Sequence, residues 1–235
     1  NDGESRDSAT SNAFLVLSGM ERKIPDMKKH IEAAYRRLDS KYGIKTFEPC
    51  FRPDNKGVGR IINLPAGTAE NAATYIHATL FAVWSLFELG ESDKAWEQIK
   101  KILPPTHKEI STTPFVMPNS YIHNEELGLD GESMSDWFTG SGCVLIKVLF
   151  FCAFGIKADL DALSVAPAAT LPFRKMKTTL RMKGGEITVS YERVAPDGKA
   201  AVSREFYVNS VKVSEVKLIN SDIAGKTLLV EIKDI

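Results

Sequence analysis

Apolar residues recur at helical spacing from residue 13 to Gly155. The clearest example opens at Pro25, a residue that favours the first turn of a helix, and we predict that this helix ends at Gly43. Its apolar face is formed by Met27, Ile31, Ala34, Tyr35 and Leu38. The same pattern predicts helices over residues 13–17, 74–89, 93–102 and 141–154, with Ser92 expected to cap the third of these.

After Gly155 the pattern changes from helical to alternating. Stretches that alternate or are rich in β-branched residues predict strands over 163–165, 177–182, 186–191, 204–208 and 228–232. Gly184-Gly185 and Asp197-Gly198 are typical of hairpin turns. The sequence therefore predicts an α+β protein, with a helical part at residues 1–157 and a small antiparallel β module at residues 158–235.

Two long connections interrupt the helical part. Residues 44–63 contain several prolines and glycines, and we expect a loop with short extended pieces there. Pro104-Pro105 begins a second connection, which continues to Glu132. Because structureless connections of such length are uncommon in compact domains and usually carry function, the second connection is a candidate for a binding region.

Composition narrows the classes of function. The chain has 235 residues, of which 43% are hydrophobic and 26% charged, as is typical of a globular domain with a sizeable core. Lysine plus arginine equals aspartate plus glutamate at 30 each, so we expect neither a nucleic acid nor a membrane as partner. The apolar run at 143–154 is too short to span a bilayer and contains Lys147.

The cysteines and the first residues bear on the setting of the protein. Cys50, Cys143 and Cys152 have no metal-ligand spacing. Cys143 and Cys152 fall in a predicted apolar helix, so we expect both side chains to be buried in the core. Free cysteines of this kind favour a reducing compartment, and we therefore expect the protein to be cytoplasmic. The chain starts at Asn1 without signal-peptide character, which we interpret as a start within a longer protein.

Several kinds of catalytic centre find no match in this sequence. The four histidines form no metal-binding spacing, and the glycine-rich stretches match neither a P-loop nor a dinucleotide fingerprint. A Gly-x-Ser-x-Gly elbow is also missing. We therefore expect neither a metal nor an organic cofactor. His30 is expected to be solvated, while His107 and His123 fall in loops and have no partner that the sequence identifies.

The first segment with candidate chemistry covers residues 64–78. It opens as a loop, carries Glu70 and Asn71, and runs into a helix near Thr74, so that His77 lies at the helix start. Helix starts favour anions because their N–H groups are free and the dipole is positive there. A carboxylate and an imidazole in this position are suited to holding a polar ligand.

The second segment covers residues 131–142, directly before an apolar helix. Thr139 and Gly140 can cap that helix with a hydroxyl and a tight turn, which is a purely structural role. The same hydroxyl and the free N–H groups can equally form an anion cradle. Trp137 would add an aromatic wall of the kind on which sugar rings stack. The residues alone leave both interpretations open.

Together the two segments form a recognisable order. Ala69-Glu-Asn-Ala-Ala-Thr-Tyr-Ile-His-Ala78 is followed by Trp137-Phe-Thr-Gly-Ser141. This order resembles the cellobiose and chitobiose phosphorylases (glycoside hydrolase family 94), which show Glu-Asn-Gly, Tyr-x-His-Ala and Trp-Tyr-Thr-Gly-Ser. Residues 1–19, 90–96 and 155–163 also resemble segments of that family, and the resemblance covers roughly residues 1–190.

The resemblance implies a fold and an activity. The fold would be an (α/α)₆ barrel, of which this chain supplies the C-terminal helices, followed by a small β-sandwich. In such enzymes inorganic phosphate attacks the anomeric carbon with inversion while an Asp protonates the leaving sugar. That Asp is expected upstream, so this chain would hold no catalytic acid. Members of the family often form dimers, and a homodimer is therefore expected to be possible.

The resemblance also implies roles for particular residues. His77, Thr139 and Gly140 would bind phosphate, which is a co-substrate rather than a cofactor. Glu70, Asn71 and Trp137 would bind the sugar.

The sequence departs from the family at positions that keep alternatives open. Ala69 replaces a basic residue, Ala72 replaces glycine, and Glu132 and Asp136 add acids before the Thr-Gly turn. One alternative is an inverting hydrolase in which Glu70, Glu132 or Asp136 serves as the base. Another is a catalytically silent carbohydrate-binding module.

Overall fold

A computed structural model describes residues 5–107, 115–137, 139–195 and 201–235. The chain divides into two compact units, Asn1–Val148 and Leu149–Ile235, each of which is described by itself. Unit 1 is helical and carries all the predicted site residues, whereas unit 2 is built mainly from strands. The predicted α+β class is therefore confirmed.

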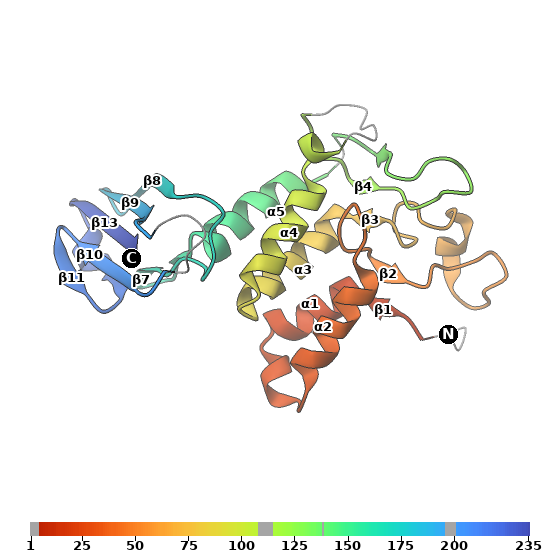
Figure 1. Cartoon of the computed structure of the whole chain (residues 1–235), viewed down its shortest axis with the longest axis horizontal. Coiled ribbons are helices and arrows are strands. Elements are labelled where there is room, and N and C mark those ends of the chain that lie inside the picture. Colours follow the sequence, from red (N-terminus) through yellow and green to blue (C-terminus); the bar gives the residue numbers. More distant parts are fainter. Residues whose placement is uncertain (1–4, 108–114, 138, 196–200) are drawn as a thin grey trace. The chain divides into compact units, whose positions relative to one another are not determined.

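The described residues of unit 1 contain five α-helices, of which α3 is the central one. They are α1 (Ala9–Leu17), α2 (Met27–Leu38), α3 (Ile76–Glu88), α4 (Ser92–Ile102) and α5 (Ser141–Val148). Three short 3₁₀-helices accompany them: η1 (Met20–Lys23), η2 (Gly59–Asn63) and η3 (Pro104–Thr106). Helix α3 packs against α1, α4 and α5, as Figure 1 shows. The start of α3 is therefore surrounded by the connections between the other helices.

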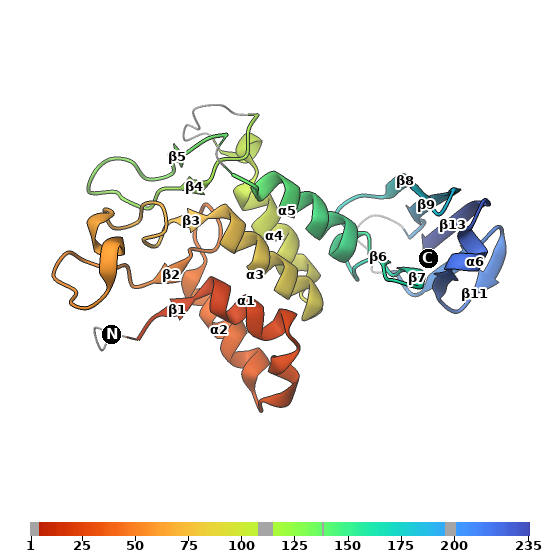
Figure 2. The same cartoon turned by 180° about the vertical axis from the view of Figure 1, so that it is seen from behind.

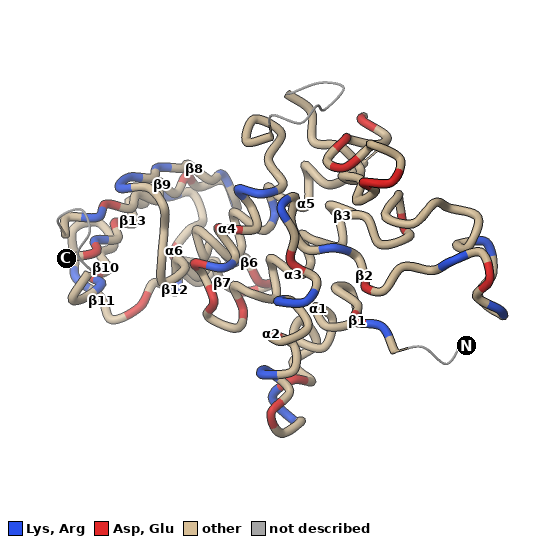
Figure 3. Tube along the Cα trace, turned by 45° about the vertical axis from the view of Figure 1, so that its right-hand side comes forward, with Lys and Arg blue, Asp and Glu red and all other residues tan. Residues whose placement is uncertain are grey.

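The helices of unit 1 are of two kinds. Helices α2 and α4 each bury one apolar face, and α2 carries charges of both signs on its other face (Figure 3). Helix α1 contains no charged residue and α3 contains only Glu88. A helix that is apolar on most sides is stable in water only when other elements pack against most of its sides. This difference explains why α3 occupies the middle of the unit.

In the part of unit 1 that the structure describes, five two-residue strands gather at the end where α1, α3 and α5 begin (Figures 1 and 2). Strand β1 (Asp7–Ser8) pairs with β2 (Phe47–Glu48). Strands β3 (Thr74–Tyr75), β4 (Ser120–Tyr121) and β5 (Ser133–Met134) form a separate sheet in the order β3-β4-β5. Both pairings in that sheet are antiparallel, so β3 and β5 point in the same direction on either side of β4.

Unit 2 begins with a π-helix, η4 (Leu149–Ala153), and continues with two sheets. The larger sheet has the order β11-β10-β13-β9-β8, and the smaller one has the order β12-β7-β6. Their strands are β6 (Ile156–Ala158), β7 (Ala162–Val165), β8 (Lys175–Met182), β9 (Gly185–Arg193), β10 (Arg204–Val208), β11 (Val211–Val213), β12 (Val216–Ile219) and β13 (Thr227–Asp234). A short helix, α6 (Asn220–Ile223), precedes β13.

One pairing corrects the expectation of a purely antiparallel module. Strand β13 runs parallel to β9, with Val230 opposite Val189, while the other strand pairs of unit 2 in the described residues are antiparallel. The predicted hairpin at 184–185 is confirmed, because β8 and β9 are joined by Lys183 and Gly184, both with positive φ, as in a type I′ turn. The other predicted turn, Asp197-Gly198, lies outside the described residues.

A buried ion pair closes the core of unit 2. Asp234 is 5% exposed and accepts hydrogen bonds from the Arg204 guanidinium and from the Tyr191 hydroxyl. Arg204 also donates to the carbonyl oxygens of Pro167 and Ala168, so its charge is fully engaged. Burial by itself would raise the pKa of the Asp234 carboxyl, but the hydrogen bonds from Arg204 and Tyr191 and the guanidinium charge together hold it below its usual value. The carboxyl therefore stays ionised inside the unit.

Several local predictions require correction. The predicted helix at 13–17 starts earlier, at Ala9, because Ser8 accepts a hydrogen bond from the amide of Ser11 and so caps it. Ser92 is the first residue of α4 rather than its cap. Cys143 is exposed, whereas Cys152 is buried as expected. The helix predicted over 141–154 divides into α5 and the π-helix. In the part of the chain that the structure describes, no helix has both the length and the apolar character needed to cross a bilayer.

Candidate functional site

The two candidate segments meet at the starts of α3 and α5. Strand β3 leads directly into α3, and β5 is followed by the turn that leads into α5. One strand lies between them, so β3 and β5 are about 10 Å apart. The helices then run side by side, since the Lys147 ammonium of α5 lies 5.5 Å from the centre of the Trp84 ring of α3. Trp84 and Lys147 stand about two turns into their helices, so the two helix starts lie at the same level.

His77 is the second residue of α3. Its ring stacks on Phe81, one turn further along the helix, with 5.1 Å between ring centroids and 29° between the planes. The side chain is half-buried, and no hydrogen bond joins its ring nitrogens to another described residue. Phe81 therefore fixes the orientation of the imidazole while its nitrogens remain available to a ligand near the positive end of the α3 dipole.

Thr139 and Gly140 form the turn before α5. The Thr139 hydroxyl accepts a hydrogen bond of 3.1 Å from the amide of Ser141, and it lies 2.6 Å from the Ser141 hydroxyl. The capping interpretation is therefore confirmed. Gly140 is exposed, and apart from the Ser141 amide that donates to Thr139, the N–H groups of the first turn of α5 have no acceptor within the helix. The turn thus combines a cap with the donors that an anion cradle requires.

Asn71 and Glu70 are neighbours in the chain but differ completely in their surroundings. Asn71 is 0% exposed, accepts from the amide of Phe51, and donates to the carbonyl oxygens of Phe51 and Leu64. Both of its side-chain N–H groups are thus used within the chain, so it holds the loop together. Glu70 is exposed and lies 4.0 Å from the guanidinium of Arg60, so its carboxylate is open to a ligand.

Backbone strain concentrates in these two segments. Among the described residues, eight non-glycine residues have positive φ, and four of them are Ala69, Ala72, Ser135 and Trp137. Such conformations are unfavourable for residues with a Cβ atom, and they cluster at functional sites when the surroundings enforce them. At Ala72 the φ of 70° also explains the preference of the resembled family for glycine at this position.

The remaining candidates differ in accessibility. Trp137 is 75% exposed between β5 and α5, as a stacking platform would require. Asp136 accepts a hydrogen bond from the Ser133 hydroxyl, and after burial it is the second cause of the raised pKa of Tyr121, a residue that is 0% exposed. The Asp136 carboxylate is therefore turned toward the interior. Glu132 is exposed, so Glu132 and Glu70 are the acids still available to the hydrolase alternative.

His123 is a largely buried residue of this region, with its side chain 14% exposed, for which the sequence indicated no role. Its Nε2 lies 2.8 Å from the Thr74 hydroxyl oxygen, and its Nδ1 lies 3.8 Å from an oxygen of Asp130. Burial first and the Lys45 ammonium second lower its pKa from 6.5 to about 4. The sequence does contain a feature that could have indicated this burial, namely the run Tyr121-Ile-His123. In an extended chain residues 121 and 123 point to the same face, and Tyr121 is fully buried.

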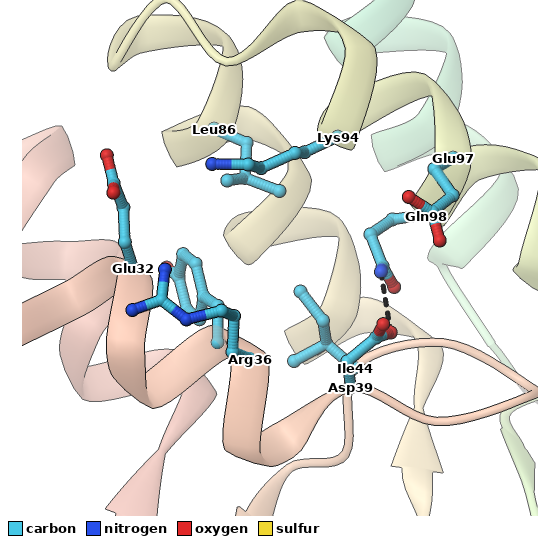
Figure 4. Close-up of a pocket in the computed structure, with 9 residues that line it drawn as sticks. Glu32, Arg36, Asp39, Ile44, Leu86, Lys94, Glu97 and Gln98 are labelled. Atoms are coloured by element: carbon cyan, nitrogen blue, oxygen red, sulfur yellow. Dashed lines mark hydrogen bonds between the residues drawn. The ribbon is translucent and has the colours of Figure 1, made fainter.

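A cavity of about 180 Å³ lies elsewhere in unit 1, between α2 and α4 (Figure 4). Tyr35, Ile44 and Leu86 provide its apolar lining, and Gln98 donates a hydrogen bond of 2.7 Å to Asp39 at its edge. The predicted site residues do not line it. In the described part of the chain, no group of three or more His, Cys, Asp or Glu side chains is arranged to hold a metal ion. The starts of α3 and α5 therefore remain the candidate site.

Comparison with known proteins bears directly on these segments. A family model described as "Glycosyl hydrolase 94 superfamily, catalytic domain" matches residues 1–152. Cellobionic acid phosphorylase of Neurospora crassa is 28% identical over 205 residues, covering 82% of this chain and 25% of the relative. N,N'-diacetylchitobiose phosphorylase of Vibrio furnissii is 27% identical over 220 residues, covering 92% of this chain and 26% of the relative.

A third relative shows a higher identity over a shorter stretch. The 3-O-beta-D-glucopyranosyl-beta-D-glucuronide phosphorylase of Paenibacillus borealis is 30% identical over 139 residues, or 57% of this chain and 18% of its own length. The chain spans about a quarter of the length of the first two relatives. The family match covers the whole of the candidate site, including both helix starts.

Proposed function

Because the chain belongs to the glycosyl hydrolase 94 superfamily, we propose that it is the C-terminal part of a glycoside phosphorylase. The enzyme would cleave a β-linked disaccharide or oligosaccharide with inorganic phosphate and release a sugar 1-phosphate. The observation that carries this proposal is the pairing of two helix starts, one with His77 and one with Thr139 and Gly140. Three of the relatives are named as phosphorylases of glycosidic substrates, which supports it.

The proposed roles follow from the geometry. Phosphate would lie between the two helix starts, where both dipoles and the free N–H groups favour an anion. His77 would donate a hydrogen bond to it from the stacked imidazole, and the Thr139 hydroxyl and Gly140 amide would bind it from the other side. Held in this way, a phosphate oxygen gains effective concentration at the anomeric carbon. Glu70 and Trp137 would face the sugar, since both are exposed and each lies a few residues before one of the two helix starts.

The bond changes of the proposed reaction are those of a single inverting displacement. A phosphate oxygen forms a bond to the anomeric carbon while the glycosidic C–O bond on the opposite face breaks. The leaving oxygen takes a proton from a general acid, which we place in the part of the parent protein that precedes Asn1. The residues of this chain would therefore bind and orient the nucleophile rather than transfer the proton.

We also propose that unit 1 contributes to an (α/α)₆ barrel. Helices α1, α3 and α5 all begin at the same end of the unit, as the repeated helical hairpins of such a barrel require (Figure 2). Phe14 of α1 is 49% exposed and Ile146 of α5 is 58% exposed. Further helices of a closed barrel would cover these apolar side chains.

The test uses the intact parent protein and a panel of β-linked disaccharides. Turnover that requires phosphate and yields a sugar 1-phosphate is the expected result. Equal turnover in phosphate-free buffer would instead identify the inverting hydrolase, and sugar binding without turnover would identify the silent module. His77→Ala is expected to lower kcat/KM for phosphate about 100-fold, whereas His30→Ala, at an exposed position on α2, should leave it unchanged.

A further inference from the structure

His123 lies two residues after β4, the strand that joins the two arms of the candidate site. Thr74 of β3 is paired with Tyr121 of β4, and His123 stands two residues beyond Tyr121 on the same face. The backbone continues to pair there, because the His123 amide donates to the Gly67 carbonyl at 2.8 Å. A Cβ atom at Gly67 would lie 1.7 Å from the His123 carbonyl oxygen, so the two chains are in close contact.

On one side His123 holds the strand that leads to His77. Its Nε2 lies 2.8 Å from the hydroxyl oxygen of Thr74, which is 0% exposed and stands three residues before His77. The amide of Ile76 donates to the Asn119 carbonyl at 3.0 Å, which ties the first residue of α3 to the chain just before β4. Displacement of Thr74 would therefore move the start of α3.

On the other side His123 faces the segment that leads to Thr139. Its Nδ1 lies 3.8 Å from one oxygen of Asp130, whose other oxygen accepts a hydrogen bond of 2.9 Å from the Tyr42 hydroxyl. The next residue, Gly131, donates its amide to the Ile122 carbonyl and leads into β5. The His123 ring thus stands between the chain segments that precede the two helix starts.

The imidazole is suited to this bridging role because it is neutral. Burial and the Lys45 ammonium lower its pKa to about 4, against the opposing effects of the Asp130 and Glu48 carboxylates. A neutral imidazole has one donor and one acceptor. Its Nε2 forms a hydrogen bond of 2.8 Å with the Thr74 hydroxyl and one of 3.3 Å with the Ser40 hydroxyl, while its Nδ1 faces the Asp130 carboxylate.

We propose that His123 is a positioning residue that fixes the start of α3 relative to the start of α5, and so sets the grip of His77 and Thr139 on phosphate. The proposal rests on the proposed function for its ligand. It assigns to His123 no contact with phosphate or sugar. Its contribution is to hold two donors at a separation that a single anion can bridge, because small displacements of such groups lower reaction rates strongly.

The first test is steady-state kinetics of the intact parent protein. His123→Ala is expected to raise the KM for phosphate about tenfold or more, while the KM for the disaccharide stays within about twofold. His123→Gln can still form a hydrogen bond with the Thr74 hydroxyl, because its amide both donates and accepts, so it should restore part of the phosphate affinity. Thr74→Val removes the same hydrogen bond from the other end, and the double variant should be no worse than His123→Ala alone.

The outcomes separate positioning from a merely structural role. A variant that is only less stable loses active protein, which lowers the apparent kcat and leaves both KM values unchanged. That result, or equal effects of His123→Gln and His123→Ala on the KM for phosphate, would overturn the proposal. His30→Ala serves as the control histidine, since it is exposed on α2.

A second measurement keeps the inference independent of the proposed function. If the parent protein shows no phosphate-dependent turnover, the proposed function fails, and hydrogen exchange then decides the role of His123. The Ile76 amide should exchange about tenfold faster in His123→Ala and in Thr74→Val than in the parent or in His30→Ala. Unchanged exchange at Ile76 in both variants would show that His123 does not hold the start of α3.

Discussion

Asn71→Ala tests whether the amide beside Glu70 serves the fold or the substrate. The Asn71 side chain accepts from the Phe51 amide and donates to two carbonyl oxygens, those of Phe51 and Leu64. Each such bond contributes about 1 kcal/mol net, so the loss of three lowers the local free energy of opening by about 3 kcal/mol. Phe51 and Leu64 are half-buried, so water can replace part of the lost hydrogen bonding to their backbone groups. The expected decrease in the free energy of opening therefore does not exceed about 3 kcal/mol.

Hydrogen exchange of the Phe51 amide is the most direct assay, because Asn71 is its described acceptor. A change of about 3 kcal/mol corresponds to exchange that is roughly 100-fold faster, provided that the amide exchanges through local opening. Asn63→Ala is the matched control, since Asn63 is exposed in the same connection and its replacement should change exchange at Phe51 by less than about twofold.

The opposite result would refute the structural assignment. Unchanged protection of the Phe51 amide in Asn71→Ala, together with a raised KM for the disaccharide, would mean that the amide serves the substrate. The sugar-binding role expected from the sequence would then stand, and the hydrogen bonds of Asn71 would have to rearrange when substrate binds.

Two further outcomes follow from the same region. Gly67→Ala should destabilise unit 1 by about 3 kcal/mol or more, whereas Gly59→Ala, with a similar positive φ but open space around it, should cost only about 1 kcal/mol in urea unfolding. Equal effects would contradict the close contact between Gly67 and His123. Because the pKa of His123 falls from 6.5 to about 4 on folding, the unfolded state binds a proton first as the pH drops, and about 3 kcal/mol of stability should be lost between pH 6.5 and pH 4. The loss of stability should disappear in His123→Gln and persist in the control His30→Gln. If stability depends on pH in the same way in the parent and in both variants, His123 is not held in a neutral form.

Local pattern in the sequence was sufficient for the elements that are long and strongly patterned. The apolar face of α2 was predicted residue by residue, because Ile31, Ala34, Tyr35 and Leu38 recur with the helical period and are all buried. Strands β8, β9 and β13 were predicted for the corresponding reason of alternation. The short motifs at 69–78 and 137–141 were also sufficient to indicate the family that the comparisons show.

The short strands of unit 1 were not predictable in the same way. Strands β3, β4 and β5 have two residues each, which is too few for any period to appear. They form because their backbone groups find partners far along the chain, as Tyr75 does with Ser120. Side-chain burial showed the same limit, since Cys143 stands in an apolar run and is nevertheless exposed, while polar Asn71 is fully buried.

The sequence by itself thus determined which segments are helical or extended, and that the candidate donors lie at the starts of helices. Only the tertiary structure decided that α3 and α5 begin side by side, because that depends on β4, which is inserted between their preceding strands. It also decided the role of His123, whose partner Thr74 is 49 residues away in the chain. Periodicity records the surroundings of one element at a time, whereas a site between two helix starts depends on contacts that no local pattern contains.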